Sequence, residues 1–503
     1  MIENKPTLPF TWPHSYFLSR WLFLRLLGVI YFIAFSSFWI QLSGLIGSEG
    51  VLPAERFLEM VKFNVGSKAY WLLPTLAWFN AHDGFLQFLA FGGTLFSVLA
   101  ISGILTMPVL VVLWIFYLSL VSAGQVFMSF QWDNLLLEAG FLAIFIAPIQ
   151  VLPRLSRESP PSWAMVWLFR LLLFRLIFSS GFGKLSSGDP TWRNFSALDF
   201  HYFTQPLPTP IAWYMYQLPE WFHRLSVGFM FFIELVVPFF IFTPRRVRFI
   251  AGAGIILLQV FIGLTGNYTF FNLLTIALCL LLFDDAFLRR LVPTKLKEFI
   301  NTSRPVLEPG NTSLYKRLGI GILALMIVFL GAIQLSSVVV GWRNTPRILQ
   351  QAFLSVSPLR IVNNYGLFRV MTTSRPEIII EGSKDGENWV EYEFKYKPGD
   401  TRRPPPWVAP HQPRLDWQMW FAALGNTQNN PWFVNLMERI LQGSPDVLRL
   451  LERDPFPGHA PKYLRGALYE YRFTNLDTKR ATGEWWQREL IGTYFYPISS
   501  NGD

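Results

Sequence analysis

The chain has 503 residues, of which 52% are hydrophobic, 17% aromatic and only 15% charged. Soluble domains contain about 25% charged residues, so this composition excludes an ordinary soluble protein and indicates a chain embedded in lipid. The formal charge of +10 does not indicate a nucleic-acid partner, because most of the excess lies in short loops between apolar segments. The single cysteine, Cys279, lies in an apolar run and excludes an internal disulfide.

Apolar runs dominate the first two thirds of the chain, and about nine are long enough to cross a bilayer as helices. They lie near 18–42, 85–103, 107–124, 134–150, 163–184, 224–242, 247–264, 268–284 and 318–341. The first run is longer than a signal-peptide core, lacks a cleavage motif and retains Arg25, so we interpret it as a span. The segment "PAERFLEMVKF" (53–63) predicts an amphipathic helix at the membrane interface.

Arginine-rich loops predict the orientation of these spans. The turn "PRRVR" (244–248) has no acidic residue, the connector 285–317 is mainly basic, and Arg154 and Arg157 mark a third basic loop. Basic loops stay on the cytoplasmic side, and all three have the parity expected for nine spans. The sequence therefore predicts a cytoplasmic N-terminus and a C-terminal region on the opposite face.

Beyond Gly341 the composition becomes that of a soluble domain. We therefore expect a multispan helical domain over residues 1–341 and an extracytoplasmic, sandwich-like β-rich domain with helical insertions over 342–503. Strands are predicted at 366–373, 377–382, 389–397, 463–473 and 485–496, and helices at 432–441 and 446–453. Asp-Gly in "SKDGEN" predicts a hairpin turn between two of these strands. The proline-rich segment 402–420 is suited to cover a surface or to bind a partner.

Ionisable residues inside the apolar runs are the first candidates for a working site. Arg175 and Glu234 are each predicted to lie about 14 Å from the outer ends of their spans, at a rise of about 1.5 Å per residue. An ion pair between these two side chains would remove the cost of a lone charge in lipid. The pair could lock two helices together, or it could handle a proton or a substrate.

Lys184, Glu138 and His201 are the candidates for acid–base chemistry. Lys184 ends a span in "GFGKL", where a lysine either extends to the interface or, when desolvated, acts as a base. Glu138, about one turn inside "SFQWDNLLLEAG", is either structural or a partner of Lys184 or His201. No motif in the sequence decides between these alternatives.

Further polar residues are predicted to gather at the non-cytoplasmic face of the membrane. They are Gln131, Trp132, Asp133, Asp189, Arg193, Asp199 and His223. His201 and His223 could form a metal site with Asp199 and Glu220, but the histidines lack the spacing of known zinc motifs. We therefore expect a hydrogen-bonded aromatic loop, with no metal and no cofactor.

Long motifs along nearly the whole chain resemble the lipase maturation factor family. They include "LIGSEGVLP" (45–53), "FQWDNLLLEAGFLAIFIAP" (130–148) and "NNYGLFRVMTTSRPEIIIEGSKDG" (363–386). The resemblance implies a multispan protein whose C-terminal region faces the lumen of the endoplasmic reticulum in animals, or the periplasm in a bacterial relative. It also implies a non-catalytic role in the maturation of exported proteins, with certain homodimeric lipases as clients and membrane lipids as surroundings.

An aromatic face beside the bilayer could hold the exposed apolar surface of an immature client. The candidates for this contact are Trp192, Tyr202, Trp213, Trp221, Trp407, Trp417 and Trp420. The membrane half is also distantly similar to vitamin K-dependent gamma-carboxylase. That resemblance implies an alternative function, a membrane enzyme using Lys184 with Glu138 or His201 on a lipid or quinone-like substrate.

Overall fold

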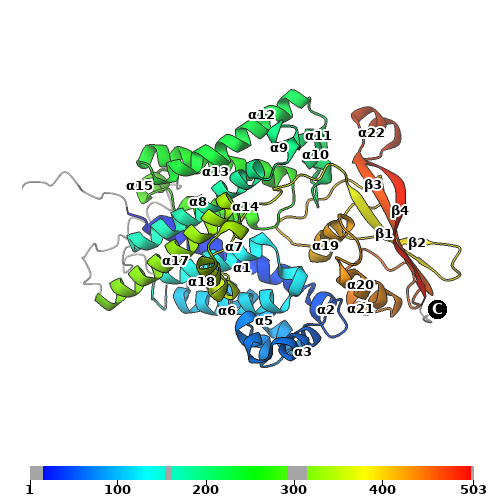
Figure 1. Ribbon diagram of the computed structural model, residues 1–503, viewed down its shortest axis with the longest axis horizontal. Coiled ribbons are helices and arrows are strands. Elements are labelled where there is room, and N and C mark those ends of the chain that lie inside the picture. Colours follow the sequence, from blue (N-terminus) through cyan, green and yellow to red (C-terminus); the bar gives the residue numbers. More distant parts are fainter. Residues whose placement is uncertain (1–14, 153–160, 292–313, 500–503) are drawn as a thin grey trace, which may run out of the picture.

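The structure, a computed structural model, describes residues 15–152, 161–291 and 314–499. A bundle of helices occupies one end of its long axis and a small β-sheet the other (Figure 1). Seven of the described helical segments are long and apolar enough to cross a membrane. They are α1 (Phe17–Trp39), α5 (Asp83–Ser102), α6 (Thr106–Ala123), α8 (Trp163–Ser186), Glu220–Phe242, α13 (Arg245–Thr265) and α17 (Leu314–Val340).

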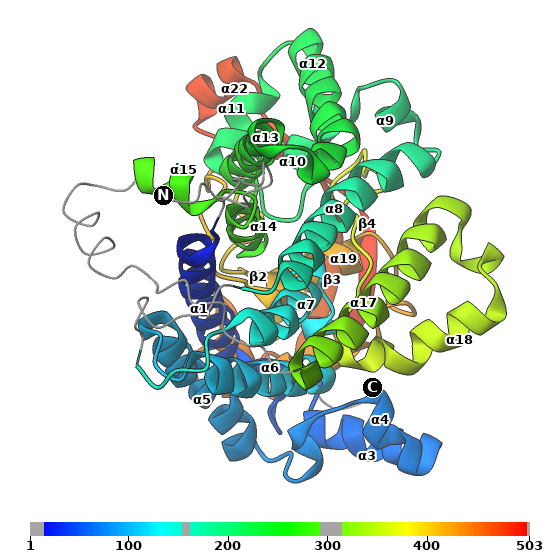
Figure 2. The ribbon, with the colours of Figure 1, turned by 90° about the vertical axis from the view of Figure 1, so that its left-hand side faces the viewer.

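The prediction of nine spans is therefore too high by this criterion. An eighth span exists only if α14 (Phe271–Leu280) and α15 (Asp285–Leu291), which are bent by 117° at their junction, count as one. The run predicted near 134–150 is α7 (Gln131–Ile146), which has 16 residues and is shorter than the roughly 20 residues needed to cross lipid. Figure 2 shows α7 near the centre of the bundle, and most of its residues are buried. A helix enclosed by protein has no need to match the thickness of the bilayer.

Helix ends gather at two opposite ends of the bundle. At the distal end, away from the sheet, Tyr16 Oη accepts hydrogen bonds from Arg170 and Arg248, and Asp285 accepts backbone N–H groups at the start of α1. At the domain end, beside the sheet, Ser37 and the C-terminal region are hydrogen-bonded. The starts of α1, α13 and α15 therefore lie together at the distal end, whereas the loop parity and the side of the membrane that each end faces stay predictions. Arg154, Arg157 and residues 292–313 of the basic connector lie outside the described residues.

Seven short helices accompany the bundle among the described residues. They are α2 (Leu42–Ile46), α3 (Ala54–Val65), α4 (Ala69–Leu72), α9 (Pro190–Arg193), α10 (Ala197–Thr204), α11 (Pro210–Tyr216) and α18 (Arg347–Val356). Helix α3 confirms the helix predicted over 53–63, and it leaves Phe63 90% exposed. Its location at a membrane interface stays a prediction.

The C-terminal region contains one antiparallel sheet with the strand order β2-β1-β3-β4. The strands are β1 (Pro376–Ser383), β2 (Val390–Tyr392), β3 (Tyr463–Phe473) and β4 (Trp486–Ser499). The predicted hairpin is confirmed, since Gly382 pairs with Val390 across the Asp-Gly turn. The prediction of a sandwich is wrong for the described residues, which form this single sheet. Helices α19 (Arg414–Ala423), α20 (Pro431–Leu441), α21 (Pro445–Leu448) and α22 (Leu476–Thr482) accompany the sheet.

Two further predictions in this region are wrong. Residues 366–373 form no strand, because their backbone N–H groups bond to the helical half: Gly366 N–H to Gln131 and Met371 N–H to Asp189. The helix predicted over 446–453 ends at Leu448, and Glu452 N–H instead bonds to the carbonyl of Glu393. The domain boundary at 341/342 stays a prediction.

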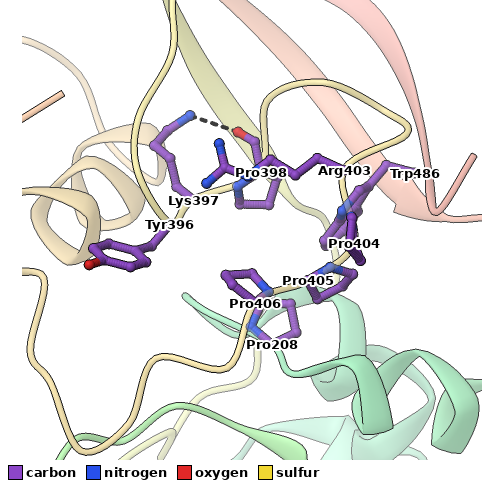
Figure 3. A pocket seen from close by; sticks show the side chains of 9 residues that line it. All are labelled: Pro208, Tyr396, Lys397, Pro398, Arg403, Pro404, Pro405, Pro406 and Trp486. Atoms are coloured by element: carbon purple, nitrogen blue, oxygen red, sulfur yellow. Dashed lines mark hydrogen bonds between the residues drawn. The ribbon is translucent and has the colours of Figure 1, made fainter. Parts of the chain in front are cut away.

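The proline-rich segment covers the membrane half of the same chain. Asn267 donates from Nδ2 to the carbonyl of Pro406 at 2.9 Å and accepts the N–H of Val408 at 2.8 Å. Figure 3 shows Pro404–Pro406 facing Pro208, around a cavity of about 10 Å³. A space of that size holds about one water molecule. This part of the segment therefore serves the internal interface and leaves no room there for a peptide or ligand.

Candidate functional site

Glu138 is the acceptor at the centre of a buried junction between the two halves. It lies on α7, is fully buried, and forms an ion pair with Arg175 of α8. It also accepts hydrogen bonds from the backbone N–H of Asn363 at 2.9 Å and from Tyr365 Oη at 2.7 Å. Arg175 in turn donates to the carbonyl of Asn363 at 3.3 Å. The C-terminal region thus completes the shell of an ion pair that belongs to the helical bundle.

The predicted ion pair between Arg175 and Glu234 is wrong. Glu234 accepts from Lys184 Nζ at both carboxylate oxygens, at 2.9 and 2.7 Å. Lys184 follows Arg175 by nine residues, which is about two and a half helical turns, so the two side chains leave opposite faces of α8. The depths of Arg175 and Glu234 along their spans were compatible with a pair. Because Arg175 and Lys184 lie on opposite faces of α8, however, Arg175 meets Glu138 and Lys184 meets Glu234.

A second buried pair joins α7 to α19. Arg414 donates to both carboxylate oxygens of Asp133 at 2.9 Å, and neither side chain is exposed. Tyr117 Oη donates to the same carboxylate at 2.5 Å, and the carbonyl of Phe127 accepts from Arg414 at 2.6 Å. A bidentate Arg–carboxylate contact of this kind is strong and directional. It fixes the start of α19 against the bundle.

The other polar residues predicted at this face do not form one cluster. Gln131 and Asp189 accept backbone N–H groups of the C-terminal region, and Asp199 lies 2.7 Å from Nδ1 of His223. Trp132 is buried and stacks on Phe130, whereas Arg193 is exposed. His201 bonds instead to Tyr268. Within the described residues no group of three or more His, Cys, Asp or Glu side chains is placed to hold a metal ion.

Most of the aromatic residues expected to contact a client are buried. Trp192, Tyr202, Trp213, Trp417 and Trp420 all have at most 6% of their surface exposed. They fill the contact between the loop 185–223, the bundle and the C-terminal region. Trp417, for example, packs edge-on against Trp132, and Trp420 donates its indole N–H to the carbonyl of Thr204. Only Trp221, at 65%, and Trp407, at 54%, are exposed enough to meet another protein.

A cavity of about 690 Å³ lies between α8, α10, α12 (Glu220–Phe231), α13 and α14. Lys184, Glu234 and His201 line this cavity, whereas Glu138 does not. Its walls are mainly aliphatic and aromatic, with a second polar contact between Asn272 Nδ2 and Gln259 Oε1 at 2.8 Å. This volume falls within the roughly 300–1,000 Å³ typical of ligand pockets. The structure therefore brings two of the three candidate acid–base residues together and separates the third.

Hydrogen bonds around His201 define its protonation state. Gln205 Nε2 donates to the carbonyl of Thr265, so its Oε1 is the acceptor for Tyr268 Oη at 2.7 Å. Tyr268 Oη must then accept from His201 Nε2, 3.0 Å away, and no described residue offers an acceptor to Nδ1, so a proton on Nδ1 would be unsatisfied. Burial, followed by the positive charge of Lys184, lowers the pKa of His201 from 6.5 to about 3. The ring is therefore neutral at physiological pH.

This neutral histidine predicts a pH dependence of stability. The unfolded chain binds a proton at His201 near pH 6.5, but the folded chain binds none until about pH 3, so stability should fall as the pH is lowered below 6.5. The expected slope is at most about 1.4 kcal/mol per pH unit. Thermal unfolding in detergent between pH 4.5 and 7.5 should show a smaller slope for His201→Gln than for the unaltered chain. Equal slopes for His201→Gln and the unaltered chain would contradict the assignment.

Several residues of these sites were not identified from the sequence. Asn363, Tyr365 and Arg414 complete the two buried pairs, and Gln259 and Tyr268 line the cavity. One signal was available, because Asp133 and Glu138 are two acids in an apolar helix with no basic residue within it. Buried carboxylates require partners, which the rest of the chain had to supply.

Together, the spans, the buried pairs and the sheet define an integral membrane protein with a C-terminal domain packed against one end of its helical bundle. The family model described as the lipase maturation factor transmembrane domain matches residues 18–290, and the C-terminal domain model matches residues 361–497. The chain belongs to the lipase maturation factor family.

Curated relatives match along most of the chain. Lipase maturation factor 1 of Bos taurus is 38% identical and the match covers 96% of this chain and 90% of the relative. Lipase maturation factor 1 of Mus musculus is 37% identical over 96% and 88%, and lipase maturation factor 2 of Homo sapiens is 36% identical over 97% and 83%. No solved structure matches the chain.

Proposed function

We propose that this protein is a membrane-bound, non-catalytic maturation factor for exported lipase-type proteins. The match to both family domains supports the role, and the relatives carry the name lipase maturation factor. The structural observation that carries the proposal is the free edge of strand β4. This strand has 14 residues, and its only strand neighbour among the described residues is β3; at its first residue, the N–H of Trp486 also bonds to the carbonyl of Thr401.

Strand β4 has the properties of a docking edge. An unpaired edge offers a row of backbone N–H and C=O groups to which an extended segment of another chain can add. Leu490, Ile491 and Tyr496 on this strand are exposed, Tyr496 by 78%. Charged residues and proline protect natural edge strands from such pairing; in β4 they are Arg488, Glu489 and Pro497, and the stretch from Leu490 to Tyr496 between them is uncharged. An immature client with an unpaired strand of its own would gain hydrogen bonds and apolar contacts here.

Release follows from the same physics. A client binds while its strand is unpaired and its apolar surface exposed, and the contact is lost once the client pairs that strand internally or across its own dimer interface. The protein then acts through differential binding of the immature state and needs no covalent step. A factor of this kind raises the fraction of the client that becomes active. The sequence of the client and the amount of it that is synthesised stay the same.

Charges on the edge strand test this proposal. The double substitution Leu490→Lys with Ile491→Lys should block strand addition, because edge lysines disfavour pairing with another chain. We expect the specific activity of a co-expressed secreted lipase to fall about tenfold, the change produced by a loss of roughly 1.4 kcal/mol in binding. Val390→Lys, on the exposed edge strand β2, is the matched control and should leave activity unchanged. Equal activity in both variants, with both proteins folded, would refute docking at β4.

The second candidate function is a membrane enzyme acting on a lipid or quinone-like substrate. The observation that favours it is the cavity, where Lys184 and His201 are both lining residues. Glu138 cannot take part in this chemistry, since its carboxylate is enclosed by Arg175, Asn363 and Tyr365. Loss of lipase maturation in Lys184→Gln with normal folding and normal client binding would favour the enzyme over the docking factor.

A further inference from the structure

The large cavity opens toward the surface that surrounds the membrane-length helices. Four of its lining residues are large apolar side chains that are exposed: Leu225 and Phe229 of α12, and Phe261 and Leu264 of α13. Leu225 is 63% and Phe261 52% exposed. Both helices belong to segments long and apolar enough to cross a membrane. Exposed apolar side chains of two membrane-length segments thus line the cavity, and in a bilayer an apolar molecule could enter between them without passing through water.

The polar groups in the cavity carry no net charge. Lys184 and Glu234 neutralise each other through two hydrogen bonds, and His201 is neutral in its hydrogen-bonded tautomer. Gln259 and Asn272 are uncharged and bonded to each other. Burying a net charge in such a site would be unfavourable, because no opposite charge remains to compensate it. The cavity therefore selects against fatty-acid carboxylates and anionic headgroups.

One donor remains at this polar end. An ammonium group has three N–H bonds, and two of those of Lys184 point to the two oxygens of Glu234. The ammonium also lies 5.5 Å from the centre of the Trp192 ring, which shares the cavity wall. An ester or hydroxyl oxygen of a ligand could accept the third N–H without displacing Glu234.

The backbone around Glu234 is specialised to place this pair at the cavity. Residues Phe232–Val236 form one turn of π-helix inside an otherwise apolar span. Such insertions are rare and frequently occur at functional sites. Gly181 of α8 allows the close approach, because a Cβ atom there would lie 2.7 Å from Cβ of Glu234. A structural pair alone would not require this turn to open onto a large empty volume.

We propose that the cavity binds one uncharged lipid that has long hydrocarbon chains and an ester or hydroxyl oxygen at its polar end. The lipid enters sideways from the bilayer between α12 and α13, places its chains against the apolar walls, and directs its oxygen to Lys184. This binding site does not depend on the maturation role, since it lies in the helical bundle and β4 lies in the sheet.

Photo-crosslinking of the full-length protein in detergent tests the proposal. The probes are a diacylglycerol, a fatty acid and a phosphatidylglycerol that carry the same diazirine in an acyl chain, with labelled peptides identified by mass spectrometry. We expect the diacylglycerol to label peptides of α12 and α13 that line the cavity. Ser226→Trp, which fills the cavity, should reduce this labelling about tenfold. Gly321→Trp is the control, because it adds the same side chain in open space on α17.

Changing the charge of the cavity gives an independent readout. Glu234→Gln leaves Lys184 uncompensated, so the preference should shift about tenfold from the diacylglycerol toward the fatty acid. Both variants are first compared with the unaltered protein by elution profile and thermal unfolding. Labelling by diacylglycerol that is insensitive to Ser226→Trp, or equal labelling by phosphatidylglycerol, would overturn the proposal. If the unaltered protein is labelled by the diacylglycerol as expected but does not raise the activity of a co-expressed lipase, the maturation role is refuted and the lipid site stands.

Discussion

Replacing Arg414 by methionine is expected to destabilise the protein by about 3–5 kcal/mol, because Asp133 would remain charged, buried and without its partner. The ion pair between Arg414 and Asp133 holds the start of α19 against the helical bundle. The C-terminal domain should therefore loosen before the bundle unfolds. Thermal unfolding in detergent measures the loss, and limited proteolysis should release a C-terminal fragment at temperatures where the unaltered protein stays intact.

Two further variants make this result specific. Arg480→Met removes an arginine from an exposed pair with Asp477 and should leave stability nearly unchanged. Asp133→Asn in the Arg414→Met background should recover part of the loss, because it removes the uncompensated charge while keeping an acceptor for Tyr117. If Arg414→Met melts and digests like Arg480→Met, the contact does not hold the domain in place.

Double-mutant cycles should show which acid belongs to which base inside the bundle. We expect coupling energies of about 0.5–3 kcal/mol for Arg175→Gln with Glu138→Gln and for Lys184→Gln with Glu234→Gln. Arg175→Gln with Glu234→Gln should be additive within about 0.5 kcal/mol, because the two side chains share no hydrogen-bond partner. All coupling energies are calculated from free energies of unfolding measured in detergent at neutral pH.

The single variants of these cycles also distinguish the structural pair at Glu138 from the ligand site at Glu234. Glu138→Gln should weaken the attachment of the C-terminal domain, since Asn363 and Tyr365 donate to the same carboxylate. Glu234→Gln should leave that attachment intact and alter lipid selectivity instead. Strong coupling between Arg175 and Glu234 would contradict the pairing of Arg175 with Glu138 and of Lys184 with Glu234.

These contacts change how the C-terminal domain should be viewed. It supplies Asn363, Tyr365 and Arg414 to buried charges of the bundle, and Asn267 of the bundle holds its proline-rich segment. Removing the domain would leave Glu138 and Asp133 without these partners and damage the membrane half. Truncation therefore cannot assign function to either half, and point substitutions on the free surface of β4 are the informative experiment.

Local patterns predicted much of the fold. Long apolar runs identified α1, α8 and α13, and the Asp-Gly turn identified the β1–β2 hairpin, because each depends on interactions between residues close in the chain. The prediction of a strand at 366–373 was wrong because this segment depends on interactions between residues far apart in the chain. Its alternation of residues suits a strand, but its backbone donors bond to Gln131 and Asp189, which are more than 180 residues away.

The tryptophans illustrate the same limit for function. Their number predicted an aromatic surface. Four of them are instead buried where the two halves pack together: Trp192, Trp213, Trp417 and Trp420. Exposure depends on which surfaces meet, and a single sequence does not contain that information in any local pattern. The edge strand β4 became a candidate only when the strand order placed it at the border of the sheet.

The sequence by itself determined that this is a multispan membrane protein of the lipase maturation factor family, with charged residues inside its apolar runs and a β-containing C-terminal region. Tertiary structure decided how those charges pair, which aromatic residues remain free, and that Lys184 and Glu234 face a cavity while Glu138 does not. The physical reason is geometric. Hydropathy and helical rise set the position of a residue along a span, whereas the face it presents and the neighbour it meets depend on the packing of helices far apart in the chain.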